Sequence, residues 1–222
     1  MTFSPEWDQR YRDHTNMAIW PWSDVVSLVM THARPAPGGA GYRVLEVGCG
    51  AGANIDFFRS LGVEYCAVEG SAAIVAMLRQ RYPDLAERLW VGDFTADLHF
   101  PGPFDLVLDR SSLTHNHTAA IRRTLTAIHG VLKPGGVFIG VQWFATDSLE
   151  YPQGQAAEDP YTRTGYRQGR FAGVGRAHFS DRDHLLDLLG GFRLEFLQKT
   201  TVENQIPEGG ALRAYWNFVA RK

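Results

Sequence analysis

The sequence predicts a single α/β domain in which a mostly parallel sheet carries helices on both faces. Apolar runs of strand length alternate with helical patterns through residues 41–143, which is typical of strand–helix–strand units. A turn with alternating glycines joins the first apolar run to the first of these helices. The length of 222 residues suits one such domain and leaves little room for a second core, and a hydrophobic content of 45% supports a sizeable core.

Residues 1–40 predict a helical cap before the sheet. Its second helix begins at Ser23, a good N-terminal capping residue, and carries apolar residues as far as Met30. Residues 35–41 are rich in proline and glycine and predict a connector into the first strand.

The first strand is Val44–Val47, and the glycine turn Gly48–Gly52 follows it directly. A helical spacing of apolar residues then continues to Phe58. Glycines let a ligand lie against bare backbone, and unpaired N–H groups at the start of a helix face any anionic part of that ligand. These features together predict a site for a nucleoside-like cofactor.

The glycine spacing alone fits two cofactors. Gly48, Gly50 and Ala53 also match the dinucleotide fingerprint of NAD-binding folds, which tolerates alanine at its third position. Glu46 lies two residues before the first glycine. A carboxylate there suits a cationic group, such as an amino-acid ammonium, better than a pyrophosphate, so it favours a cofactor other than NAD.

Acidic residues also follow the next two strands. Glu69 ends the second apolar run, where its two oxygens can accept hydrogen bonds from both hydroxyls of a ribose. Asp93 and Phe94 follow the third short strand. The carboxylate suits the exocyclic amine of a purine, and the ring can lie against the purine face.

The alternation continues to residue 143 and then changes. Ser71 caps the next helix, and a helix from about Thr118 places one apolar stripe as far as Leu132, before Pro134 ends it. The fifth strand is expected at residues 137–143. Beyond it, Ser180 caps a helix that closes at Gly190-Gly191, and residues 192–200 and 212–220 predict two strands joined by turn formers at 204–210.

Five pieces in this order resemble class I S-adenosylmethionine-dependent methyltransferases. They are Leu45–Gly52, Glu69, Gly92-Asp93-Phe94, Phe104–Asp109 as the fourth strand, and Leu132–Gly136 before the fifth. The resemblance covers residues 40–145. It implies a doubly wound, Rossmann-like sheet of seven mostly parallel strands with an antiparallel last strand.

The resemblance also implies S-adenosylmethionine as the cofactor and S-adenosylhomocysteine as its product. Glu69 would then hold the ribose, Asp93 and Phe94 the adenine, and the glycine turn would lie under the methionine part. Tyr11, Trp20 and Trp22 precede the sheet, and we expect one of them to touch the cofactor, since aromatic faces attract a sulfonium as they do other cations. Packing of the N-terminal helices on the core is the alternative. The full set expected around the cofactor is Trp20, Glu46, Gly48, Cys49, Gly50, Asn54, Glu69, Gly70, Ser71, Asp93, Phe94, Asp109 and Arg110.

The segment after the fourth strand is expected to face the acceptor, because ligands of doubly wound sheets sit beyond the carboxyl ends of the strands. His115 is the first candidate base for a hydroxyl acceptor, and His178 is the second. The alternatives are a helix-entry residue bonded to backbone for the first and a buried structural histidine for the second. Asp109 is expected to support the cofactor or orient a neighbour, and Arg110 to bind a carboxylate or pair with Asp109.

Residues 144–179 form the longest irregular section, which predicts a lid or binding loop. Its interleaved arginines and aromatics suit an anionic or polyhydroxylated substrate, and we expect Tyr161, Tyr166 and Arg170 to bind it. The alternative is a solvated loop whose tyrosines fix it to the body. His115-Asn116-His117 has no evident third ligand, so no metal is expected.

Composition limits the partners. A net charge of −2 offers no broad basic surface for a nucleic acid, and two cysteines give no disulfide framework. Residues 1–14 do not resemble a signal peptide, and no apolar run approaches the ~20 residues that span a bilayer. We expect a cytoplasmic monomer or homodimer with a small-molecule substrate and neither a nucleic-acid nor a membrane partner.

These inferences predict one domain over residues 1–222: a helical cap (1–40), a cofactor-binding core (41–143), a substrate lid (144–179) and a C-terminal helix with a strand hairpin (180–222). The expected activity is methyl transfer (EC 2.1.1.-) to a small polar acceptor. A hydroxyl of a sugar-like or other metabolite is favoured, and N-methylation is the close alternative. A NAD-dependent oxidoreductase and a non-catalytic S-adenosylmethionine-binding module are the other classes left open.

Overall fold

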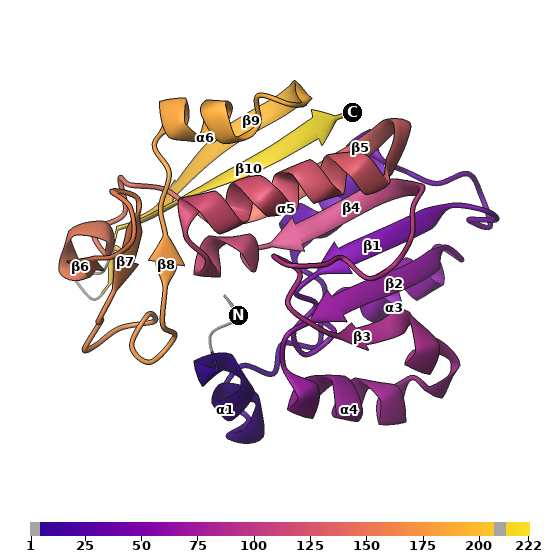
Figure 1. Ribbon diagram of the computed structural model, residues 1–222, viewed down its shortest axis with the longest axis horizontal. Helices are drawn as coiled ribbons and strands as arrows, with labels where there is room; N and C mark the ends of the chain where they lie inside the picture. The colour runs from indigo at the N-terminus through magenta and orange to yellow at the C-terminus, as the bar shows by residue number, and fades with distance from the viewer. Residues whose placement is uncertain (1–4, 207–211) are drawn as a thin grey trace.

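A seven-stranded sheet forms the centre of the computed structural model, which describes residues 5–206 and 212–222. The strand order is β3-β2-β1-β4-β5-β10-β9 (Figure 1). Parallel pairing joins the five strands β1 (Arg43–Val47), β2 (Glu64–Glu69), β3 (Leu89–Val91), β4 (Phe104–Arg110) and β5 (Leu132–Phe144). β10 (Arg213–Arg221) runs antiparallel to β5 and to β9 (Arg193–Val202). The predicted sheet, including its antiparallel last strand, is confirmed.

The register brings three strand ends to one edge of the sheet. Val47, the last residue of β1, pairs with Val68 of β2 on one side and with Asp109 of β4 on the other. The residues that follow these strands therefore meet in space, although they are separated by tens of positions in the sequence.

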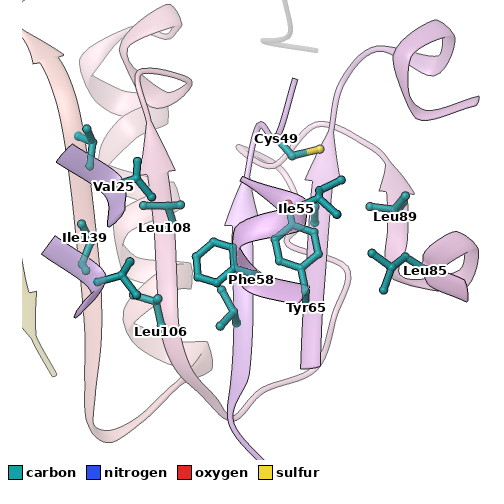
Figure 2. Close-up of a cluster of buried hydrophobic side chains, with 14 of the residues drawn as sticks. Val25, Cys49, Ile55, Phe58, Tyr65, Leu85, Leu89, Leu106, Leu108 and Ile139 are labelled. Carbon is teal, nitrogen blue, oxygen red and sulfur yellow. The ribbon is translucent and has the colours of Figure 1, made fainter. Parts of the chain in front are cut away.

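Helices cover both faces of the sheet. They are α1 (Glu6–Arg12), α2 (Ser23–His32), α3 (Ile55–Ser60), α4 (Ala72–Arg81), α5 (Thr118–Val131) and α6 (Arg182–Leu188), with 3-10 turns η1 (Pro83–Arg88), η2 (Leu113–His115) and η3 (Tyr151–Gln153). Leu106 and Leu108 of β4 pack into a core with α2, α3 and α4, part of which Figure 2 shows. Val107, between them, points to the opposite core, which contains α5 and α6. No helix in the described ranges is long and apolar enough to cross a bilayer.

The section expected to be one irregular lid is instead organised. It contains an antiparallel sheet of β6 (Gln155–Ala156), β7 (Thr162–Thr164) and β8 (Ala177–His178). Phe144, Tyr166, Phe171 and Val174 give this insertion a small core of its own. Figure 1 shows the insertion and α1 on the side of the molecule toward which the arrowheads of β1, β2 and β4 point.

Several element ends differ from expectation. α5 ends at Val131, and Leu132 already pairs with Phe104 as the start of β5. The cause is Pro134, because the residue before a proline avoids the helical region. The cap of α6 is Asp181 rather than Ser180. Part of the expected turn at 204–210 lies outside the described residues.

Of the two other predicted caps, one forms and one does not. Ser71 accepts a hydrogen bond from the backbone N–H of Ile74 at 3.3 Å, as a helix cap should. Ser23 begins α2, but α2 has no side-chain cap hydrogen bond. The predicted helix starts are therefore right in both places, whereas the capping interaction forms at only one of them.

Candidate functional site

A cavity of about 430 Å³ opens at the edge where β1, β2 and β4 end. This volume lies in the range of about 300–1,000 Å³ that is common for small-molecule sites. Its walls come from two parts of the chain. The glycine half comprises Glu46, Gly48, Cys49, Gly50, Ala51, Ala53, Asn54, Glu69, Asp93 and Phe94, and the arginine half comprises Trp7, Tyr11, Thr15, Asn16, Met17, Ala18, Trp22, Arg110, Ser111, Ser112, His115 and Asn116.

The glycine turn leaves backbone exposed to the cavity. Gly48 and Gly50 have φ angles of 71° and 52°, in the left-handed region that favours glycine. A Cβ on Gly50 would lie 2.8 Å from the hydroxyl oxygen of Tyr11, and one on Gly48 would lie 2.3 Å from the Cβ of Ser112. Only glycine keeps this part of the wall open, as a cofactor lying against the turn requires.

Glu46 is buried beside this turn, with 2% of its surface exposed. Its carboxylate accepts hydrogen bonds from the hydroxyl of Tyr65 at 2.6 Å and from the amide of Asn54 at 2.8 Å. Burial raises the pKa of Glu46 to about 7, although these two hydrogen bonds oppose the rise. The Oδ1 atom of Asn54 is buried and has no hydrogen-bond partner among the described residues. A cationic group in the cavity would satisfy that oxygen and favour ionised Glu46, so the pair fits an ammonium.

Glu69, at the end of β2, connects two backbone segments. Its oxygens accept the N–H of Gly50 at 2.9 Å and the N–H of Ser71 at 3.0 Å. Burial raises the pKa of Glu69 above its usual value. Each carboxylate oxygen can accept a second hydrogen bond, so Glu69 can still bind two hydroxyls.

Gly70 and Ser71 lie outside the cavity walls, contrary to expectation. The hydroxyl of Ser71 caps α4 and donates to Asp8 at 2.5 Å. Its side chain is therefore occupied by contacts within the chain, and its role is to fix the start of α4 and the position of α1.

Asp93 and Phe94 follow β3 and line the far end of the glycine half. The Oδ1 atom of Asp93 accepts hydrogen bonds from the N–H and the hydroxyl of Thr95, at 2.9 and 2.7 Å. The carboxylate is thus fixed in orientation next to an aromatic ring, which fits the pair of contacts expected for a purine.

α1 closes the cavity opposite the glycine turn. Asp8 bonds to the N-terminus of α4, and Arg10 donates to two backbone carbonyls of the insertion. Trp7 and Tyr11 are four residues apart, so they share one face of this helix, and both line the cavity. The helix is anchored on both sides while its aromatic face covers the site.

Trp20 does not line the cavity, and its side chain is 77% exposed. Trp20 is therefore not among the predicted aromatic residues that the structure places at the cavity. Tyr11 and Trp22 take its place in the wall. The ring of Trp22 lies 3.8 Å from the guanidinium carbon of Arg110, and this cation–π contact fixes Trp22 at the site.

Arg110, the last residue of β4, points into the cavity wall without a carboxylate partner. Its Nη2 donates to the side-chain oxygen of Gln142 at 2.5 Å. The Nε atom is buried and has no partner in the described part of the chain, and no acidic side chain there lies within ion-pair distance. Burial lowers the pKa of Arg110 to about 10, so the side chain stays cationic at neutral pH. The expected alternative, a pair with Asp109, does not form.

Gln142 reaches Arg110 from an unusual backbone conformation. Its φ is 56°, and the φ of Ser111 is 58°, both in the left-handed region. Such residues cost on the order of 1–3 kcal/mol each and persist where their surroundings fix them. The Ser111 hydroxyl donates to the Gln142 carbonyl at 2.8 Å, and the Gln142 N–H donates to Asn217 at 2.8 Å. Asn217 lies where β10 shifts register against β5.

Asp109 is fully buried and does not line the cavity, which fits the second of its two expected roles, the orientation of a neighbour. One oxygen accepts the N–H groups of Ser112 and Leu113 at 3.1 and 3.0 Å, and the other accepts the indole N–H of Trp143 at 2.5 Å. Burial raises the pKa of Asp109 to about 6. Asp109 shapes the turn that carries Arg110 and His115.

His115 lines the arginine half, in line with its candidacy. Its Nδ1 lies 2.8 Å from the carbonyl oxygen of Arg176, so Nδ1 carries the proton and Nε2 does not. The ring makes edge contacts with Trp7 at 4.7 Å and Phe144 at 5.6 Å. Burial lowers the pKa of His115 to about 4, and nearby arginines add to the effect. His115 is therefore neutral at physiological pH.

His178, the second candidate base, is completely buried and lies outside the cavity walls. Its Nδ1 is 3.1 Å from the hydroxyl of Thr162, and its Nε2 is 3.2 Å from Nε2 of His184. Burial lowers the pKa of His178 to about 3. The alternative interpretation, a structural histidine, fits these contacts.

The three residues expected to bind substrate also lie outside the cavity walls. Tyr161 stacks on His184 at 3.6 Å, and Tyr166 is 8% exposed within the core of the insertion. Arg170 forms a bidentate ion pair with Glu150, with bonds of 2.7–3.0 Å. Tyr161 and Arg170 are thus engaged by other residues of the chain, whereas the buried hydroxyl of Tyr166 has no partner among the described residues. The structure does not bring these three residues to the cavity.

The structure adds site residues that the sequence did not identify. Trp7, Asn16 and Met17 line the cavity, and Gln142 supports it. The spacing of Trp7 and Tyr11 in a helical pattern was an available signal. No local pattern marks Gln142, because its role depends on a left-handed backbone and on a partner in another strand.

Comparison with known proteins agrees with this arrangement. Residues 44–136 match a family model described as a methyltransferase domain. A tRNA N(3)-cytidine methyltransferase of Danio rerio is 26% identical over 212 residues, and the match covers 89% of this chain but only 58% of that protein. The chain thus spans little more than half the length of this curated relative.

Solved structures share the fold. A SAM-dependent methyltransferase of Methanosarcina mazei superposes with a TM-score of 0.68 at 18% identity, covering 87% of this chain and 96% of that one. The 1,6-didemethyltoxoflavin-N1-methyltransferase of Burkholderia thailandensis superposes with a TM-score of 0.62 at 23% identity, covering 96% and 84%. The matched domain, the strand order and the glycine turn together make the chain similar to class I S-adenosylmethionine-dependent methyltransferases.

Proposed function

We propose that the chain transfers a methyl group from S-adenosylmethionine to a small polar molecule. The observation that carries this proposal is the single cavity of about 430 Å³, in which the glycine half and the arginine half share one space. A methyl donor and an acceptor must meet in such a space, because the transfer is an in-line displacement that requires alignment and exclusion of water. α1, anchored on both sides, covers that space.

The glycine half fits the donor. Glu46 and Asn54 suit the ammonium of the methionine part, Glu69 suits the ribose hydroxyls, and Asp93 with Phe94 suits the adenine. When bound, the donor supplies an electrophilic methyl group on a sulfonium, and the sulfur keeps the electron pair of the broken bond. The chain's own residues bind and orient this group.

For a hydroxyl acceptor, His115 is the proposed base. The carbonyl of Arg176 keeps the proton on Nδ1, so Nε2 can take the hydroxyl proton while the acceptor oxygen bonds to the methyl carbon. A hydroxyl of a sugar-like or other metabolite is the acceptor we propose first.

N-methylation is the second candidate, and a specific observation favours it. The pKa of His115 is lowered to about 4, chiefly by burial, which makes His115 a weak base. An amine attacks through a free electron pair and loses its proton only after the new bond has formed. Such an acceptor needs a hydrogen-bond partner at His115 rather than a strong base.

The test uses the purified chain with methyl-labelled S-adenosylmethionine and a metabolite extract that also contains RNA. We expect the label to enter the small-molecule fraction, and mass spectrometry of the product then decides between oxygen and nitrogen. The control is a Gly50→Val variant, whose donor site should be blocked. Any label that this variant transfers does not come from the chain's own donor site. Label in RNA would contradict the small-molecule proposal, and donor binding without any labelled product would indicate a non-catalytic module.

A further inference from the structure

We propose that Arg110 forms a carboxylate-binding subsite, and that the methyl acceptor is a small molecule that carries a carboxylate. This inference rests on the proposed function, which it extends by naming the class of acceptor. Four observations support it.

The first observation is the unused hydrogen-bonding capacity of Arg110. A guanidinium has five N–H donors in a planar fork that matches a carboxylate. Within the described residues, Arg110 uses one nitrogen, which donates to Gln142, while Nε is buried and unpartnered. Leaving such a group unpaired is costly inside a protein, and an anionic ligand group would remove that cost.

The second observation is that other arginines near the site have partners in the chain. Arg170, at an exposed position, pairs with Glu150. Arg163 donates to the hydroxyl of Tyr151 at 2.6 Å, and although its Nε also lacks a partner among the described residues, Arg163 does not line the cavity. Arg176 pairs with Glu158. Against this pattern, Arg110 differs in facing a cavity with only an amide and an indole ring beside its guanidinium.

The third observation is the charge of the arginine half. Among its described lining residues, Arg110 is the sole side chain with a formal charge at neutral pH, since burial keeps His115 neutral. The acidic groups Glu46, Glu69 and Asp93 all belong to the glycine half. An acceptor with a negative group therefore complements the arginine half.

The fourth observation is the direction of the guanidinium. β4 lies between β1 and β5 in the sheet. Arg110 bonds to Gln142 on β5, and β5 lies on the opposite side of β4 from β1, the strand that carries Glu46. The subsite thus lies on the acceptor side, and Trp7, Met17 and Trp22 supply apolar surface for the rest of the molecule.

The support behind Arg110 also indicates a positioned group. Gln142 holds the guanidinium from a left-handed backbone that Ser111 and Asn217 stabilise through hydrogen bonds. A planar guanidinium clamped between an amide and an aromatic ring presents a fixed fork to a ligand. We therefore treat Gln142 as a positioning residue for this subsite.

The experiment measures binding of paired probes to the full chain saturated with S-adenosylhomocysteine. The pairs are benzoate and benzamide, 4-hydroxybenzoate and 4-hydroxybenzamide, and indole-3-acetate and indole-3-acetamide. Members of a pair have nearly the same shape and differ in charge. We expect at least one carboxylate to bind about tenfold more tightly than its amide or better, as charge-assisted bidentate bonds predict.

The variant Arg110→Gln should abolish this preference, and Arg110→Lys should keep only part of it, since lysine retains the charge without the planar fork. Arg167→Gln, at an exposed position of the insertion, is the matched control and should retain the preference. Thermal unfolding of each variant establishes that it is folded. The inference is overturned if no carboxylate is preferred by the unmodified chain, or if the preference persists in Arg110→Gln.

A further measurement decides whether Arg110 binds the carboxylate of the acceptor or the carboxylate of the donor's amino-acid part. 5′-Methylthioadenosine lacks the amino-acid part of S-adenosylhomocysteine. If Arg110→Gln weakens binding of S-adenosylhomocysteine and leaves 5′-methylthioadenosine unaffected, Arg110 binds the donor carboxylate and the inference is wrong. If the unmodified chain binds neither nucleoside, the proposed function fails. Binding of the probe pairs to the chain without S-adenosylhomocysteine then tests the subsite separately.

Discussion

The two halves of the cavity differ in how their charged groups are satisfied. In the glycine half, Glu46 and Glu69 already accept hydrogen bonds from the chain itself, including the N–H of Gly50. In the arginine half, Arg110 has an amide and an aromatic ring beside it and no carboxylate. The glycine half is thus preorganised by its own backbone, whereas the arginine half leaves a charge for a ligand to complete.

The largest effect is expected from closing the glycine half. Gly50→Val should abolish measurable binding of S-adenosylhomocysteine in calorimetry, because a Cβ there lies 2.8 Å from the hydroxyl of Tyr11 and the φ of 52° disfavours valine. Gly38→Val is the matched control, since Gly38 has a φ of 83° and open space around its Cβ position. Equal loss in both variants would show that backbone strain, and not the shape of the cavity, causes the effect.

In the arginine half, the next largest effect is expected for His115→Gln. If His115 removes the proton of a hydroxyl acceptor, turnover should fall about 10²-fold or more, the usual contribution of a general base. Binding of S-adenosylhomocysteine should change little, because the glycine half is untouched. The measurement is single-turnover methyl transfer to the product identified with labelled donor.

The control for this variant is His178→Gln, which alters a buried histidine outside the cavity. It should lower the melting temperature while turnover of the folded fraction stays the same. Turnover unaffected by His115→Gln would instead favour N-methylation, in which no base is needed before attack.

The glycine half could be predicted from the sequence because its residues lie in local patterns. The sheet, the glycine turn and the acidic strand ends are local patterns, and Glu46, Glu69, Asp93 and Phe94 all line the cavity as expected. Parallel strands of similar register bring their ends to one edge, so residues that end consecutive strands meet without further information.

The arginine half could be predicted only in part, because its contacts join distant segments. Arg110 meets Trp22 and Gln142, which lie 88 residues before it and 32 residues after it in the chain. The arginines and tyrosines of the insertion carried the stronger local signal for ligand binding, yet Arg170 pairs with Glu150. Composition shows that charges are present and does not show which of them already have partners.

Within the glycine half, Glu69→Ala should give an intermediate effect. The ribose hydroxyls of S-adenosylhomocysteine would lose their acceptor, which costs roughly 1–3 kcal/mol, or about fivefold to 150-fold in affinity. The N–H groups of Gly50 and Ser71 would also lose their acceptor, which lowers stability with or without the ligand. The matched control is Glu64→Ala at the start of the same strand, where the carboxylate forms a partly exposed ion pair with Arg43. Unchanged affinity in Glu69→Ala would remove Glu69 from the donor site.

The smallest expected effect is a pH dependence of donor affinity, which should come from the glycine half alone. Burial raises the pKa of Glu46 to about 7, so without a ligand the carboxyl is mostly protonated at pH 6. A cationic donor favours the ionised form, and its affinity should therefore rise by up to about eightfold between about pH 6 and about pH 7.5, following the ionised fraction of Glu46. Calorimetry with S-adenosylmethionine in this range, which lies below the pKa of most α-amino groups, measures the rise together with the release of a proton.

Glu46→Gln should flatten that rise. Asp109→Asn should preserve it with a midpoint at somewhat lower pH, because the negative charge of Asp109 contributes to the raised pKa of Glu46. Asp109 has a pKa raised to about 6 by burial, but it lies outside the cavity and bonds to the turn after β4. Glu46 should also make the stability of the ligand-free chain depend on pH, in the direction opposite to the donor affinity. A folded-state pKa above the usual value near 4.5 means that the folded chain binds the extra proton, so the free energy of unfolding falls as pH rises toward 7. If donor affinity does not change with pH while stability does, Glu46 is a buried structural carboxyl and the ammonium binds elsewhere in the glycine half.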